Sequence, residues 1–77
     1  DIAPDERILA ALKRKRMELA REEGVPAFVI FADRTLIDMA ERRPATLDDM
    51  LEVHGVGHRK LARYGDAFLE ALHDALR

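Results

Sequence analysis

Apolar residues return to one side of a helix near the start of the chain. Between Asp5 and Glu22 charged residues occupy the rest of the helix surface, and the apolar positions are Ile8, Leu9, Leu12 and Leu19. This spacing is typical of an amphipathic helix that buries one face. We therefore predict a helix over residues 5–22, which Gly24 ends.

The next segment is apolar on nearly every side. It runs from Phe28 to Phe31 and follows Pro26, which suits the first turn of a helix. Its composition also fits a strand, but the chain offers no second strand, and a lone strand would leave its backbone groups unpaired. We predict a short helix whose apolar side chains lie in the core.

Two helices are predicted in the middle of the chain. Asp33 suits the cap of a helix that ends before Pro44 and turns three residues inward: Leu36, Met39 and Ala40. Thr46 suits the cap of the next, where the Asp49 carboxylate favours the positive helix N-terminus. That helix is short because Gly55 follows, and its apolar residues are Leu47, Met50, Leu51 and Val53.

The last third of the chain is predicted to be helical on both sides of Gly65. Leu61 and Ala62 face inward before this glycine breaks the helix, and a final helix begins at Asp66. The buried stripe of the final helix is Phe68, Leu69, Leu72, Ala75 and Leu76. The fold class is therefore all-α, a compact bundle of about five short helices in a single domain over residues 1–77.

Composition limits the classes of function. Apolar residues make up 48% of the 77 residues and charged residues 36%, which is typical of a globular domain, and the absence of cysteine excludes disulfides and thiolate metal sites. The longest apolar run, residues 25–32, is too short for the roughly 20 residues of a membrane-spanning helix. We expect a cytoplasmic protein, nucleoid-associated if bacterial, with no membrane partner. The first residues carry no initiating Met and no signal-type core, so we expect a fragment of a larger protein.

Charge predicts that any nucleic-acid site is local. The net charge is −2 and the pI is about 5.9, whereas strong nucleic-acid binders usually have a pI above about 9. The exception is the segment from Val53 to Gly65, which contains Gly-Val-Gly at residues 55–57 and no acid before Asp66. Its positively charged side chains are Arg59, Lys60 and Arg63, and it also contains His54 and His58.

Gly-Val-Gly between two helices is the pattern of a helix-hairpin-helix turn. Gly55 and Gly57 allow a phosphate to approach the main chain, and the first N–H groups of the helix that follows are unpaired donors at a positive dipole end. The alternative is purely architectural, because such turns also join helices only to reverse the chain, and Arg and Lys on a helix usually form a solvated face. We predict a phosphate site here.

A second basic run, residues 13–16, lies on the first helix. At 100° per residue Arg16 falls on the apolar face, so we predict that it is largely buried and paired with a carboxylate, Asp33 being the first choice. Lys13, Arg14 and Arg21 point away from that face. They are either a solubilising surface or an extension of a phosphate track.

Catalytic and metal chemistry find no support in the sequence. His54 and His58 have i,i+4 spacing, but two glycines separate them and no further ligand follows at motif spacing. The carboxylates form no paired array for acid–base work, and no Gly-rich loop ends in Lys-Ser or Lys-Thr. We expect no enzyme activity, no metal and no cofactor.

The segments of residues 12–44 and 47–69 resemble the HRDC domain of RecQ-family helicases and of RNase D. The resemblance rests on several elements in order: Val25-Pro26, Ile30-Phe31, Asp33-x-Thr35-Leu36, Met39-Ala40, Pro44, Gly55-Val56-Gly57, Lys60-Leu61 and Tyr64-Gly65. It implies a five-helix, non-catalytic accessory domain of a helicase. Such domains bind single-stranded or branched DNA weakly and tune which DNA structures the helicase selects, and some use the domain for protein contacts. The helicase version is closer than the nuclease version.

Two departures from the family pattern matter. Phe28 stands where family members often have Tyr, so a hydroxyl contact is lost; a base could still stack on Phe28, but we favour plain core packing. Acids flank the hairpin and oppose phosphate binding. The expected nucleic-acid contacts are Gly55, Val56, Gly57, His58, Arg59, Lys60, Arg63, Phe28, Lys13 and Arg14.

The expected partners are DNA and the helicase core of the same polypeptide, with other proteins as an option, and the chain is expected to be a monomer. Two alternatives stay open. The domain could be a docking module that contacts the helicase body or a partner protein with little DNA binding, or an RNase D-type module that binds RNA.

Overall fold

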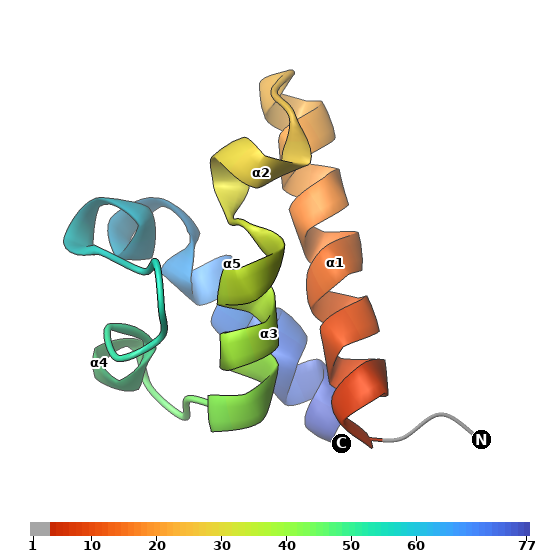
Figure 1. Cartoon of the computed structure of the whole chain (residues 1–77), viewed down its shortest axis with the longest axis vertical. Helices are drawn as coiled ribbons and strands as arrows, with labels where there is room; N and C mark the ends of the chain where they lie inside the picture. Colours follow the sequence, from red (N-terminus) through yellow and green to blue (C-terminus); the bar gives the residue numbers. More distant parts are fainter. Residues whose placement is uncertain (1–3) are drawn as a thin grey trace.

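A computed structural model describes residues 4–77, which form five helices (Figure 1). These are α1 (Pro4–Glu23), α2 (Ala27–Ile30), α3 (Asp33–Arg42), α4 (Leu47–Met50) and α5 (His58–Leu76). The long helices α1 and α5 run past each other in opposite directions, α3 packs beside α1, and α4 lies against α5 on the side away from α1 (Figure 1). The all-α, five-helix prediction is confirmed.

The core centres on the aromatic ring of Phe31. The ring of Phe68 meets it edge-on with centroids 5.0 Å apart, and the ring of Tyr64 does so at 6.0 Å. Edge-to-face pairs at such distances add to the stabilisation from burial. The other large, fully buried side chains come from α1 and from every later helix: Ile8, Leu12, Ile30, Leu36, Met39, Met50 and Leu72.

The prediction of a helix break at Gly65 is wrong. Helix α5 continues through this residue as one 19-residue helix. Gly65 is buried, and a Cβ placed there would lie 2.9 Å from Leu61 Cδ1 and 3.0 Å from Leu47 Cδ2. The glycine therefore provides room for α4 to pack closely against α5. Ala62, which was predicted to face inward, is exposed to solvent.

The short helix α2 is only partly in the core. Ile30 and the following Phe31 are buried as predicted, but the Phe28 side of the helix is not: Phe28 is 71% exposed and Val29 is 41% exposed. A four-residue helix is a single turn, so only one side of it can face α1. The prediction that Phe28 packs in the core is therefore wrong.

The helix ends show which capping predictions hold. Thr46 Oγ1 accepts a hydrogen bond from the Asp49 N–H at 3.1 Å, which confirms Thr46 as the cap of α4. Asp33 is not a cap: it is the first residue of α3, Ala32 precedes it, and no side chain caps the helix. The Asp33 carboxylate instead pairs with Arg16.

Arg16 confirms the prediction of a buried, paired arginine. Its side chain is 12% exposed, and its Nη2 lies 2.7 Å from Asp33 Oδ1. Its Nη1 donates a hydrogen bond of 2.9 Å to the Phe31 carbonyl, which follows the end of α2. The hydrogen bond from Arg16 lowers the pKa of Asp33, and the charge of Lys13 lowers it further. One arginine of α1 thus holds the junction between α2 and α3.

Candidate nucleic-acid interface

The loop before α5 is held against α3 by a glycine contact. Gly55 has a φ of +81°, and a Cβ at this position would lie 2.5 Å from Thr35 Oγ1. Thr35 is buried on α3. Both the backbone angle and the space therefore require glycine at position 55.

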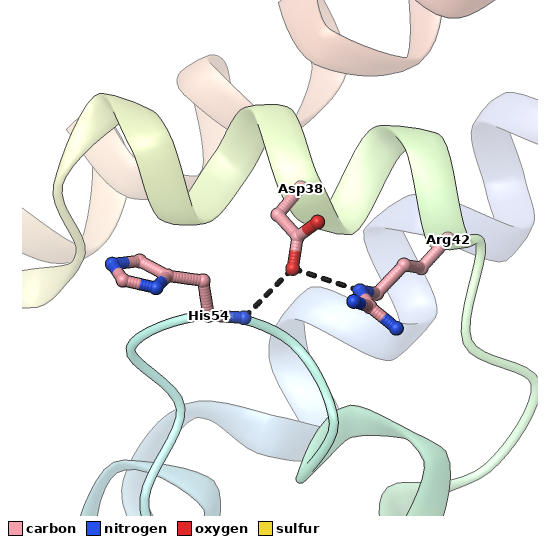
Figure 2. Close-up of polar contacts among 3 residues, drawn as sticks. All are labelled: Asp38, Arg42 and His54. Atoms are coloured by element: carbon pink, nitrogen blue, oxygen red, sulfur yellow. Dashed lines mark hydrogen bonds and ion pairs between the residues drawn. The ribbon is translucent and has the colours of Figure 1, made fainter.

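Asp38 supplies the second anchor of this loop. Its Oδ2 accepts a hydrogen bond of 2.8 Å from the backbone N–H of His54 and one of 2.9 Å from Arg42 Nε (Figure 2). The hydrogen bond from His54 lowers the pKa of Asp38, and the contact with Arg42 lowers it further. The His54 ring points away from the carboxylate (Figure 2), so the backbone, not the imidazole, makes the contact.

The substitution Asp38→Asn is expected to destabilise the domain at neutral pH by about 1 kcal/mol, because a charge-assisted hydrogen bond becomes a neutral one. The folded-state pKa lies below the ordinary value of 3.8, so the contribution is fully present above that value and is lost as the pH falls through the folded-state pKa. Urea unfolding between pH 7 and pH 2 measures it. The gap between wild type and variant should close at low pH.

Asp66→Asn is the matched control, because Asp66 is exposed and makes no ion pair within residues 4–77. It should leave the wild-type pH dependence in place. A gap between wild type and Asp38→Asn that stays constant down to pH 2 would contradict the assigned role of Asp38.

The N-terminus of α5 is open to solvent and uncapped. Gly57 is the residue before the helix, and its carbonyl accepts the first helical hydrogen bond, from the Leu61 N–H at 2.9 Å. No side chain caps this end and its first turn holds no acid, whereas α1, α3 and α4 each carry acids there. The N–H groups at the start of α5 therefore remain donors at a positive dipole end.

The predicted side chains of the hairpin differ in their exposure and in whether they already have a partner within the domain. His58 and Arg59 are exposed, whereas Lys60 lies with its Nζ 5.5 Å from the centroid of the Phe31 ring. Arg63 Nη2 is 3.3 Å from Glu23 Oε1 at the end of α1. Val56 is buried, and its backbone N–H donates a hydrogen bond of 3.1 Å to the Val53 carbonyl.

Glu23 is a residue that the sequence did not single out. The same Oε1 that faces Arg63 accepts a hydrogen bond of 2.8 Å from the Tyr64 hydroxyl. Burial raises the pKa of Tyr64, and the hydrogen bond to Glu23 raises it further. This contact fastens the end of α1 to the first half of α5. Glu23 and Tyr64 are 41 positions apart in the chain, so the sequence carries no signal for the pair.

Phe28 lies in a separate groove. The groove has a volume of about 420 Å³ and is lined by residues of α1, α2 and the start of α3: Arg16, Ala27, Phe28, Ala32 and Asp33. Lys13 is close enough to lower the pKa of Asp33. Arg14 instead lines a groove between α1 and α5. The structure therefore divides the ten predicted contact residues among three places: the hairpin, the Phe28 groove with Lys13, and the α1–α5 groove with Arg14.

Two properties of the described residues concern other classes of site. Within residues 4–77 no group of three or more His, Cys, Asp or Glu side chains is placed to hold a metal ion. None of the described helices is long and apolar enough to cross a membrane.

The helices and their packing define the class of the protein, a small all-α domain. Its fold is shared with the solved structure of D. radiodurans RecQ HRDC domain 3, with a TM-score of 0.91, 38% sequence identity, and coverage of 94% of this chain and 95% of that one. The HRDC domain family matches residues 5–72. The chain belongs to the HRDC domain family, as the resemblance in the sequence indicated.

Related full-length proteins are helicases. The chain is 39% identical over 71 residues to the ATP-dependent DNA helicase RecQ of Bacillus subtilis, which covers 92% of this chain and 12% of the helicase. It is 42% identical over 66 residues to the ATP-dependent DNA helicase UvrD2 of Mycobacterium tuberculosis, which covers 86% of this chain and 9% of that protein. The chain thus spans about a tenth of these relatives and corresponds to an accessory domain of helicases.

Proposed function

We propose that this chain is a non-catalytic accessory domain of a longer RecQ-type DNA helicase, and that it binds single-stranded or branched DNA weakly and shifts the DNA structures that the helicase selects. The observation that carries the proposal is the uncapped N-terminus of α5, with no acid in its first turn and with His58 and Arg59 exposed beside it. Such a helix end is a binding site for a phosphate group. The cytoplasm, or the nucleoid of a bacterium, is the compartment that suits this role.

Binding at this site is expected to be weak and sensitive to salt. Lys60 and Arg63 already have partners within the domain, and the chain has a net charge of −2. With about two to four phosphates neutralised, the log–log slope of affinity against salt should be about −1.5 to −3 for single strands. Exposed Phe28 offers a stacking surface for a base of the same ligand.

Gly57→Asp is expected to reduce the affinity for single-stranded DNA at least tenfold while leaving the fold intact. Gly57 has a φ of −95°, and a Cβ there has no atom within 4 Å, so the site accepts a side chain. The new carboxylate would cap α5 and repel the phosphate, at an end where Asp is among the preferred caps. Fluorescence anisotropy at 50 and 200 mM salt measures binding, and circular dichroism measures the melting temperature.

Gly57→Asn is the matched control, because it caps the helix without a charge. It should retain more of the affinity than Gly57→Asp at an equal melting temperature. Equal DNA affinity in wild type and Gly57→Asp would remove the end of α5 from the binding site. Tighter binding of RNA than of DNA by the wild type would favour the RNase D-type role.

One surface favours the alternative of a protein-docking module. An apolar groove of about 230 Å³ lies between α1 and α3, with Leu9, Ile37 and Ala40 in it and acids around it: Asp5, Glu6 and Glu41. Acids repel DNA but suit a partner that carries basic residues. Loss of function in an Ile37→Asp variant of the full helicase with unchanged DNA binding by the domain would favour docking.

A further inference from the structure

A second basic surface lies between the first half of α1 and the C-terminal end of α5, two helices that lie side by side (Figure 1). It is a groove of about 390 Å³. Four of its eight lining residues are Arg or Lys, three are Ala and one is an acid: Arg7, Arg14, Lys15, Arg77, Ala11, Ala71, Ala75 and Asp74. In a chain with a net charge of −2, this is a local concentration of positive charge.

The helical period explains how α1 creates this surface. Residues 13–16 are all basic, and at 100° per residue they wind around the helix. On the side of α3, Arg16 forms an ion pair with Asp33, and Lys13 lies close enough to act on the same carboxylate. Arg14 and Lys15 instead line the groove between α1 and α5. Arg7 precedes Arg14 by two turns and lies about 10 Å along the same side of α1.

The charge of the groove is largely uncompensated within residues 4–77. Lys15 Nζ lies 3.5 Å from Glu18, and Arg77 Nη2 lies 3.6 Å from Asp74. Both are exposed pairs, which contribute little and exchange readily. Arg7 and Arg14 form no ion pair with the described residues. Their guanidinium groups are available to a ligand.

The groove suits a phosphate backbone better than a protein. Its apolar lining consists of three alanines, which offer little contact area to the aromatic or aliphatic anchor on which protein interfaces depend. Phosphate contacts require only charge and hydrogen-bond donors, which Arg supplies in bidentate form. The distance of about 10 Å from Arg7 to Arg14 corresponds to about three phosphates at 3.4 Å per residue of one strand.

We infer that this groove binds the backbone of a second DNA segment while the N-terminus of α5 binds the first, so that DNA with two arms, such as a fork, is the preferred ligand. The inference rests on the proposed function of the hairpin. The two sites lie at opposite ends of α5, about 24 Å apart from His58 to Asp74 at 1.5 Å per residue. On a fork, the second contact is intramolecular and raises the affinity.

The double variant Arg7→Gln/Arg14→Gln tests the groove. Its affinity for a fork at 50 mM salt should fall about tenfold, and its salt slope should become less steep by about 2, because two phosphate contacts are lost. Its affinity for a single strand of three nucleotides should not change, since so short a strand, even when extended, does not reach across the roughly 24 Å from the hairpin to the groove. Fluorescence anisotropy gives both values.

Arg21→Gln/Arg34→Gln is the charge-matched control, because both residues are exposed and neither lines the groove. A fork affinity that falls equally in both double variants, or in neither, overturns the inference. The inference is also overturned if a labelled poly-glutamate peptide binds in the groove and fork DNA at any concentration fails to displace it. Loss of fork binding in Arg7→Gln/Arg14→Gln with no effect of Gly57→Asp on either DNA would instead retain the groove and reject the hairpin site.

Discussion

Phe31→Ala is expected to cost about 3–5 kcal/mol of folding free energy, the range for removing a buried Phe side chain. Phe31 is 1% exposed, and it meets the rings of Tyr64 and Phe68 edge-on. A domain of 77 residues has only about 4–12 kcal/mol of stability in total, so the variant should lose a large share of it and melt at a much lower temperature than the wild type. Urea unfolding followed by circular dichroism measures the loss.

Phe28→Ala is the control for this prediction, since Phe28 precedes Phe31 by one turn but is 71% exposed. It should change stability by less than about 0.5 kcal/mol, as surface substitutions generally do. A comparable loss in both variants would mean that Phe28 is buried, contrary to the structure. The same Phe28→Ala protein reports on stacking if its DNA affinity falls.

Gly55→Ala is expected to cost about 2–5 kcal/mol. A left-handed backbone angle costs a residue with a side chain about 1–2 kcal/mol, and a Cβ 2.5 Å from Thr35 Oγ1 forces α3 and the loop apart, with an overpacking cost of about 1–3 kcal/mol. Because the loop positions the start of α5, DNA binding should fall as well. Thermal unfolding and anisotropy measure the two effects.

Gly24→Ala separates the two costs. Gly24 has a similar φ of +66°, but a Cβ there meets no atom within 4 Å, so only the backbone cost of about 1–2 kcal/mol is expected. In the double variant Gly55→Ala/Thr35→Ala, the Thr35 hydroxyl oxygen that would lie too close to the new Cβ is gone. After the effect of Thr35→Ala alone is subtracted, the loss of folding free energy should approach that of Gly24→Ala. A Gly55→Ala protein as stable as Gly24→Ala would contradict the contact with Thr35.

The sequence by itself determined the first four helices and the family. The amphipathic spacing of α1, the Thr46 cap and the inward Leu36, Met39 and Ala40 depend on residues near one another in the chain, so local rules predict them. The pairing of Arg16 with Asp33 could also be predicted, because a cation on an apolar helix face must find a carboxylate. The HRDC resemblance rests on several sequence elements in the family's order, and it implied a five-helix domain.

Only the tertiary structure decided which surfaces are exposed and what holds the hairpin. Gly65 was predicted to break a helix because glycine lowers helix propensity, yet it lies inside α5, where the missing side chain leaves room for Leu47 to pack closely. Phe28 faces solvent because one turn of helix has a single buried side. The contacts that hold the hairpin join residues 16 to 41 positions apart in the chain, and they are made by Asp38, Thr35 and Glu23. Such contacts follow from how helices pack in space, which the periodicity of one helix does not specify.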